Sequence, residues 1–177
     1  MTAKTASSTR AVMSEVMTPD DANFLGKVFG GRLLAIMDLC AFVTAARFCG
    51  EICVTASIDK VDFHEPIEVG EVVSLTGMVT HVGRTSMEIT IEVHAENVLK
   101  GVVRHTNTAR LVMVAIKDDR PVEVPRFVCE TREEKISFLM GRFRRENRAQ
   151  SKEAQAAMAG RFEAANDAEL DALLNHS

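Results

Sequence analysis

The sequence predicts an α+β domain with a helical extension at its C-terminal end. Three observations carry this prediction: an apolar stretch long enough for a central helix, several segments of alternating apolar residues, and helical apolar spacing near the C-terminus. One helix followed by antiparallel strands is the α+β pattern, and 177 residues can bury one such core. The expected parts are a disordered N-terminus at residues 1–9, the domain at residues 10–126 and the extension at residues 127–177.

A short strand and a long helix open the domain. Residues 11–17, AVMSEVM, read as the first strand, and a polar loop follows it. From Gly31 to Phe48 nearly every residue is apolar, which indicates a buried helix about 27 Å long. Gly50 comes directly after this stretch and predicts the end of the helix, because glycine adopts the left-handed conformation of a C-cap without strain.

After the helix, apolar residues recur at every second position, which indicates strands. In the first of them Val54, Ala56 and Ile58 are expected on the buried face, and the phase then slips to Val61. This slip predicts a β-bulge near residues 59–60. The clearest alternation, at residues 87–95, predicts one face in the core and one in water. The expected strands are residues 54–63, 73–79, 87–95 and 102–116.

A charged segment with two prolines, residues 117–125, separates the strands from the extension. Apolar residues at helical spacing then predict one amphipathic helix around residues 136–143 and a second around residues 154–165. Asn166 or Asp167 can cap a final helical turn. We expect these helices to pack on the domain or on a neighbouring subunit.

Composition argues against several functions. A net charge of −4 and the absence of Trp and Tyr give no basis for binding nucleic acid. The four cysteines lack the spacing of zinc ligands, so we expect free thiols and no metal site. The N-terminus has no apolar segment of a secretory signal, and no apolar run is long enough to span a membrane. We therefore expect a cytoplasmic protein that does not bind membranes.

Asp38 is the first candidate for chemistry, because it is an acid inside the apolar helix. A buried carboxylate is costly unless it is paired, hydrogen-bonded or protonated. Just before the helix, Gly30 and Gly31 permit a tight turn, and the free N–H groups at a helix start can polarise a carbonyl. Asn23 in the same loop offers a side-chain amide, although an asparagine there is also typical of a turn.

These residues lie in the segment PDDANFLGKVFGGRLLAIMD, which resembles the signature of the acyl-CoA thioesterases of hotdog fold. In that family a P-x-D-x-N-x-x-G-x-x-x-G-G loop leads into a central helix with an M-D pair. The stretches TASIDKVDFHEPIEVGEVVSLTG and VGRTSMEITIEV match the family as well. The resemblance implies a curled sheet around the central helix, and hydrolysis of acyl-CoA to free fatty acid and CoA, with no cofactor beyond the CoA of the substrate.

The resemblance also implies roles for particular residues. The family's catalytic Asn and Asp fall on Asn23 and Asp38, and its helix-to-helix dimer places the two on different subunits of one site. The backbone at Gly30 and Gly31 would hold the thioester carbonyl. Asp38 would act as a general base on water or as a nucleophile, and the sequence leaves both mechanisms open.

Coenzyme A and further subunits are the remaining partners that the resemblance implies. The turn with Arg84, Thr85 and Ser86 corresponds to a region near the CoA site of the family. The C-terminal helices could join dimers into a trimer of dimers.

Two other functions remain as alternatives. One is a hotdog enoyl-CoA hydratase or dehydratase, which would need a histidine that residues 19–48 do not provide. The other is a non-catalytic acyl-CoA sensor.

Overall fold

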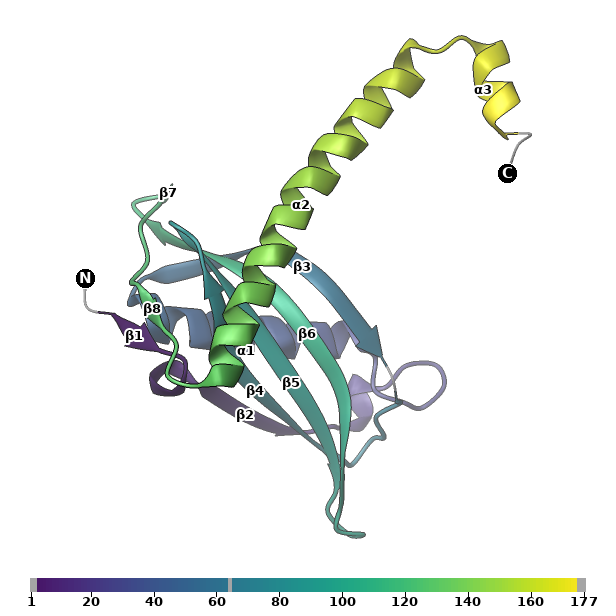
Figure 1. Ribbon diagram of the computed structural model, residues 1–177. Coiled ribbons are helices and arrows are strands. Elements are labelled where there is room, and N and C mark those ends of the chain that lie inside the picture. Colours follow the sequence, from purple (N-terminus) through teal and green to yellow (C-terminus); the bar gives the residue numbers. More distant parts are fainter. Residues whose placement is uncertain (1–2, 64, 175–177) are drawn as a thin grey trace. The chain divides into compact units, whose positions relative to one another are not determined.

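The structure is a computed structural model that describes residues 3–63 and 65–174, with the side chains of all of these except Lys60 and Asp62 (Figure 1). The chain forms two compact units, Met1–Leu139 and Met140–Ser177. The first unit contains the predicted domain, and the second contains most of the extension. No helix among the described residues is long and apolar enough to cross a membrane.

The first unit is an antiparallel sheet curled around the helix α1 (Gly30–Cys49), as Figure 1 shows. The strand order is β2-β4-β5-β6-β3, and a short strand β7 (Arg120–Pro121) pairs with the end of β6. This arrangement confirms the α+β prediction. The strands are β2 (Ala11–Val16), β3 (Ile52–Phe63), β4 (Val72–Val82), β5 (Ser86–Asn97) and β6 (Val102–Lys117).

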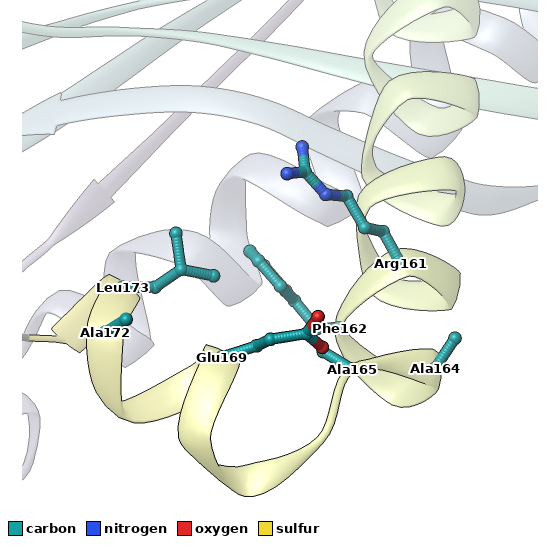
Figure 2. A pocket seen from close by; sticks show the side chains of 7 residues that line it. All are labelled: Arg161, Phe162, Ala164, Ala165, Glu169, Ala172 and Leu173. Atoms are coloured by element: carbon teal, nitrogen blue, oxygen red, sulfur yellow. The ribbon is translucent and has the colours of Figure 1, made fainter.

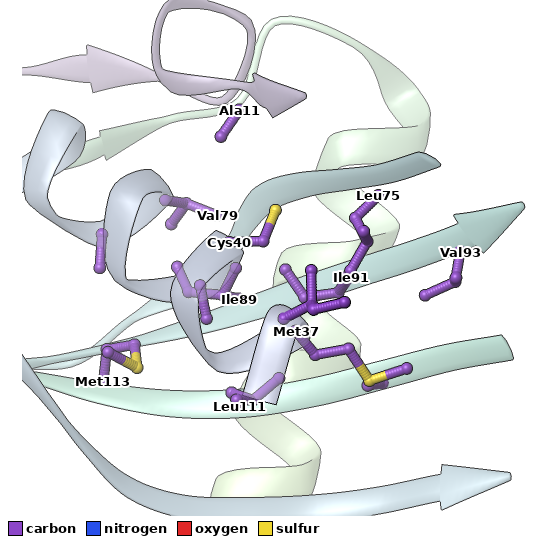
Figure 3. Packing of buried hydrophobic residues seen from close by; sticks show 14 of the residues in the cluster. Ala11, Met37, Cys40, Leu75, Val79, Ile89, Ile91, Val93, Leu111 and Met113 are labelled. Carbon is purple, nitrogen blue, oxygen red and sulfur yellow. The ribbon is translucent and has the colours of Figure 1, made fainter. Parts of the chain in front are cut away.

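One side of α1 packs on the concave face of the sheet, and its buried residues recur at intervals of three and four positions. Figure 3 shows two of them, Met37 and Cys40, among side chains from the central strands. The other side stays exposed, with Leu39 52% accessible and Phe42 partly so. Within one chain the helix is therefore buried only on the side that faces the sheet, because the curled sheet covers only one side. Gly50, at φ 76°, ends α1 as predicted.

The alternation predicted for residues 87–95 is confirmed, with one exception. Met87, Ile89, Ile91, Val93 and Ala95 all lie in the core. Glu88 was expected in water but is only 2% exposed, and its Oε1 accepts a hydrogen bond from Thr80 Oγ1 at 2.9 Å. The outer face of the sheet is covered at this point, because the neighbouring ring of His81 packs 4.8 Å from that of Phe138.

The pairing of β3 with β6 shifts register between Ile58 and Val61, which confirms the predicted bulge. A second shift, between Thr55 and Ser57, was not predicted. It reverses the expected phase at the start of β3, because Val54 is exposed while Thr55 faces α1. β3 is an edge strand of the sheet, and its apolar residues Ile52 and Val54 are exposed.

The N-terminal segment differs from the expected disorder. Strand β1 (Lys4–Thr5) pairs in parallel with β8 (Phe127–Val128), and a short 3-10 helix, η1 (Ser7–Thr9), follows it. Ala6 and Thr9 are buried, so this mostly polar segment packs on the domain through two small side chains. Residues 1 and 2 lie outside the described residues.

The extension forms one long helix, α2 (Arg132–Ala164), instead of the two that were expected. The intervening residues are mostly good helix formers, so nothing ends the first helix where its apolar stripe stops. A short helix α3 (Asp167–Leu174) follows, and Asn166 caps it as predicted, because Asn166 Oδ1 accepts the N–H of Glu169 at 3.0 Å. Figure 2 shows a hollow of about 460 Å³ between α3 and the end of α2.

The contact between α1 and β4 generates a stability prediction. A Cβ at Gly77 would lie 2.3 Å from Thr44 Oγ1 and 3.1 Å from Cys40 Sγ, so the helix sits too close for any side chain there. Gly77→Ala should lower the free energy of unfolding by about 1–3 kcal/mol in urea denaturation. Thr44→Ala removes the nearest atom, so the same glycine substitution should cost less in that background. Equal costs in the two backgrounds would contradict this close approach.

Candidate active site

The loop before α1 holds Asn23 in a fixed turn. The N–H of Asn23 donates to Lys27 O at 2.7 Å, next to an isolated antiparallel bridge between Ala22 and Val28. Its side-chain Oδ1 accepts the N–H groups of Leu25 at 2.8 Å and Lys27 at 3.1 Å. The turn role that the sequence allowed for Asn23 is therefore present. Because the amide oxygen is used in this turn, the amide NH₂ is the group that can reach a ligand.

Asn23 and Gly30 lie together in a pocket of about 360 Å³ with mostly apolar walls. Leu33, Phe63 and Ile67 line it, and Asn107 adds a buried polar side chain. The first backbone hydrogen bonds of α1 are donated by Arg32 and Leu33, both to Phe29 O. The N–H groups of Gly30 and Gly31 thus precede the first backbone hydrogen bonds of α1 and lie at the positive end of the helix dipole.

Ionic contacts fix the second wall of this pocket, the loop of residues 65–71. Lys27 Nζ lies 2.5 Å from Glu68 Oε1, and Val28 N–H donates to Ile67 O at 2.9 Å, so the two loops are joined. Glu71 is almost fully buried and accepts hydrogen bonds from both terminal nitrogens of Arg104, at 2.7 and 2.8 Å. These hydrogen bonds lower the pKa of Glu71, against the effect of its burial.

Asp38 is half-buried and lies on the open side of α1, and it is not among the residues lining the Asn23 pocket. It accepts a hydrogen bond from the hydroxyl of Thr55 on β3, which also lies 3.3 Å from Met113 Sδ. The predicted need for a polar partner is met, although the sequence did not identify Thr55. Its place in an alternating strand suggested a water-facing residue, and only the unpredicted register shift turns it toward α1.

Of the three residues expected near CoA, Arg84 and Thr85 lie in the turn between β4 and β5, and Ser86 is the first residue of β5. The side chain of Arg84 is 80% exposed, and its Nη1 lies 4.0 Å from Glu123 Oε1. Backbone hydrogen bonds fix the turn itself, because Ala115 N–H donates to Thr85 O at 3.0 Å and Gly83 N–H donates to Ser86 O at 2.7 Å. Within one chain this turn does not line the Asn23 pocket. Among the described residues, no cluster of His, Cys, Asp and Glu is placed to hold a metal ion.

Comparisons with known proteins show the family and the fold of the chain. A family model described as the thioesterase superfamily matches residues 25–102. The uncharacterized acyl-CoA thioester hydrolase YkhA of Bacillus subtilis is 40% identical over 126 residues, which are 71% of this chain and 73% of YkhA. The crystal structure of an apo hexameric acyl-CoA thioesterase superposes with a TM-score of 0.82 at 38% identity, covering 86% of this chain and 98% of the other. The expected hotdog fold is thereby confirmed.

An acyl-CoA hydrolase of Staphylococcus aureus is also similar, with a TM-score of 0.79 and 29% identity over 92% of this chain and 99% of the other. Its structure was solved in complex with butyryl-CoA, CoA and CoA disulfide. Three of its alanine mutants have also been solved, in which an asparagine, an aspartate and a threonine are replaced. These positions follow one another at intervals of 15 and 17 residues, the intervals that separate Asn23, Asp38 and Thr55.

The Glu71–Arg104 pair predicts a pH dependence of stability. The folded-state pKa of Glu71 is lowered, so its contribution is present above the ordinary carboxyl pKa of about 4.3 and is lost as the pH falls through the folded pKa. Glu71→Gln should therefore unfold more easily than wild type at pH 7, by about 1–3 kcal/mol, and the difference should shrink below about pH 4. Urea denaturation at several pH values measures this difference. Glu123→Gln, at an exposed site, is the control and should change little; a Glu71 deficit independent of pH would contradict the assignment.

Proposed function

The chain belongs to the thioesterase superfamily, among its acyl-CoA thioester hydrolases, and on this basis we propose that it hydrolyses acyl-CoA to free fatty acid and CoA. The observation that supports this most is the match in spacing of Asn23, Asp38 and Thr55 to the three residues replaced in the S. aureus hydrolase. The geometry adds to it, because the asparagine lies beside a helix start in an apolar pocket and the aspartate is hydrogen-bonded to the threonine.

The start of α1 is suited to the thioester carbonyl. The N–H groups of Gly30 and Gly31 precede the first helical hydrogen bonds, so they can donate to the carbonyl oxygen. Their donation strengthens as negative charge develops on that oxygen in the transition state. The NH₂ group of Asn23 lines the same pocket and would hold either the water or the carbonyl. The apolar walls would receive the acyl chain.

Asp38 then supplies the chemical step by one of two routes. As a general base it takes a proton from water, whose oxygen attacks the carbonyl carbon while the C–S bond breaks and CoA leaves as a thiolate. As a nucleophile it attacks the carbonyl carbon itself, the C–S bond breaks and CoA leaves as a thiolate, and water then cleaves the resulting anhydride to the free acid and the Asp38 carboxylate. The Thr55 hydroxyl holds the carboxylate in one orientation and serves both routes. No metal or organic cofactor takes part in either.

We further propose that one site uses two chains. Asp38 lies on the open side of α1 beside exposed Leu39, and the edge strand β3 carries exposed apolar residues, namely Ile52, Val54 and Ile58. A second copy that packs its own α1 and β3 on these surfaces by two-fold symmetry would cover both. Asn23 would then meet Asp38 of the partner subunit. Three such dimers would make a hexamer, the state named for two similar structures.

We place this activity in the cytoplasm. The chain has four free cysteines, and the sulfur atoms of Cys49 and Cys53 are hydrogen-bonded at 3.3 Å; free thiols are the usual state of cysteines in a reducing compartment. For the hydratase alternative, none of the described residues lining the pocket is a histidine. A crotonyl-CoA hydration assay tests that alternative directly.

Asp38→Asn tests the catalytic assignment. Turnover, followed as free thiol released from a panel of acyl-CoAs, should fall at least about 100-fold, because an amide neither accepts the proton nor attacks the carbon. The fold should persist, since the amide oxygen can still accept the Thr55 hydroxyl. Asp20→Asn, at an exposed acid of the Asn23 loop, is the matched control and should keep full activity. A folded Asp38→Asn enzyme with wild-type kcat would remove Asp38 from the mechanism.

Arg84→Ala tests the proposed CoA contacts of the Arg84–Ser86 turn. Loss of one guanidinium contact to phosphate should raise KM for acyl-CoA about tenfold and leave kcat nearly unchanged, because the contact is equal in ground and transition states. Arg120→Ala, at another exposed arginine of the domain, serves as the control for lost surface charge. If KM stays at its wild-type value in Arg84→Ala, CoA binds elsewhere.

A further inference from the structure

We propose that Arg32 is a positioning residue that holds the Asn23 loop at a set angle to the start of α1; this inference rests on the proposed thioesterase function. Arg32 stands in the first turn of α1, one residue after the glycine pair. Its Nε donates to Asp21 Oδ1 at 2.7 Å, and its Nη2 donates to Glu15 of β2. A single guanidinium therefore joins the helix, the loop and an edge strand of the sheet.

Asp21 stands at the start of the loop that carries Asn23. Its side chain is 10% exposed, and its Oδ2 accepts the N–H and the hydroxyl of Thr18 at 2.7 and 2.8 Å. Its backbone oxygen accepts the N–H of Phe29 at 2.7 Å, across the two ends of the loop. Asn23 follows Asp21 by two residues, and its N–H donates to Lys27 O in the same pair of hydrogen-bonded segments. A shift of Asp21 relative to α1 would thus be carried directly to the Asn23 amide.

The charges make this link persistent at neutral pH. Hydrogen bonds from the Thr18 backbone and side chain and from Arg32 lower the pKa of Asp21, and the Asp21 bond raises the pKa of Arg32. A planar guanidinium that donates to two carboxylates through different nitrogens also fixes the orientation of the two carboxylates relative to each other, which a point charge such as an ammonium group does not.

Other contacts hold the loop folded, so the role of Arg32 is separable from stability. The far side of the loop is attached to residues 65–71 through the Lys27–Glu68 pair and the Val28–Ile67 hydrogen bond. Loss of Arg32 leaves these contacts and the Thr18–Asp21 cap in place. What changes is the position of Asn23 relative to the N–H groups of Gly30 and Gly31, and a misplacement of about 1 Å is enough to lower a rate about 100-fold.

The experiment compares Arg32→Ala and Arg32→Lys with wild type in free-thiol release from acyl-CoA. We expect kcat of Arg32→Ala to fall about 10- to 100-fold, KM to change less than about threefold, and Arg32→Lys to recover part of kcat by pairing with one carboxylate. Arg47→Ala is the matched control. That arginine stands near the other end of α1, donates to Arg10 O at 2.9 Å, and its loss should leave kcat unchanged.

A double mutant separates positioning from general damage. If Arg32 acts through Asn23, adding Arg32→Ala to Asn23→Ala should leave the residual activity unchanged. A further loss of the same size in that background would overturn the proposal, as would wild-type kcat in folded Arg32→Ala. If Arg32→Ala does not fold, the same comparison is made with Arg32→Lys, which should lose kcat only when Asn23 is present. A wild-type protein that releases no thiol from any acyl-CoA would instead refute the proposed function.

Discussion

The curled sheet can cover only one side of α1, and the rest of the structure depends on this constraint. The covered side carries the residues that form the core with β4, β5 and β6. It approaches so closely at Gly77 that no side chain fits between helix and strand. The open side keeps Leu39 and Phe42 in water, and the adjacent edge strand β3 adds further exposed apolar residues. Exposed apolar surface of this kind is typical of a face that another protein covers.

The same constraint separates the two candidate catalytic residues, Asn23 and Asp38, within one chain. The start of α1 and the Asn23 loop form a pocket that is held by ionic contacts from two sides, whereas Asp38 lies two turns further along, outside this pocket. Within the chain Asp38 has only the Thr55 hydroxyl as a described hydrogen-bond partner. A second copy placed on the open side would bring its Asp38 to the pocket and would remove the exposed apolar surface in the same step. Burial of apolar surface and assembly of the active site would then favour the same dimer.

Much of this fold could be predicted from the sequence, because local periodicity determines it. The central helix, its end at Gly50, the strand at residues 87–95 and the bulge before Val61 all follow from patterns within a few residues. What could not be predicted depends on contacts distant in sequence. Glu88 is hydrogen-bonded to Thr80 and lies beside His81, whose ring packs on Phe138 of α2, and Thr55 turns toward Asp38 because of a register shift relative to β6.

The candidate site was predicted to a similar degree. Asn23, Asp38 and the glycine pair stood out by residue type and by resemblance, but their division between a pocket and an open helix face appears only in three dimensions.

Subunit complementation most directly tests whether Asn23 of one chain works with Asp38 of another. Asn23→Ala and Asp38→Ala should each be nearly inactive alone, and after mixing and reassembly each heterodimer should hold one intact and one doubly altered site. Thiol release should return to about a quarter of the wild-type rate if subunits pair at random. No recovery despite demonstrated subunit exchange would contradict a site built from two chains.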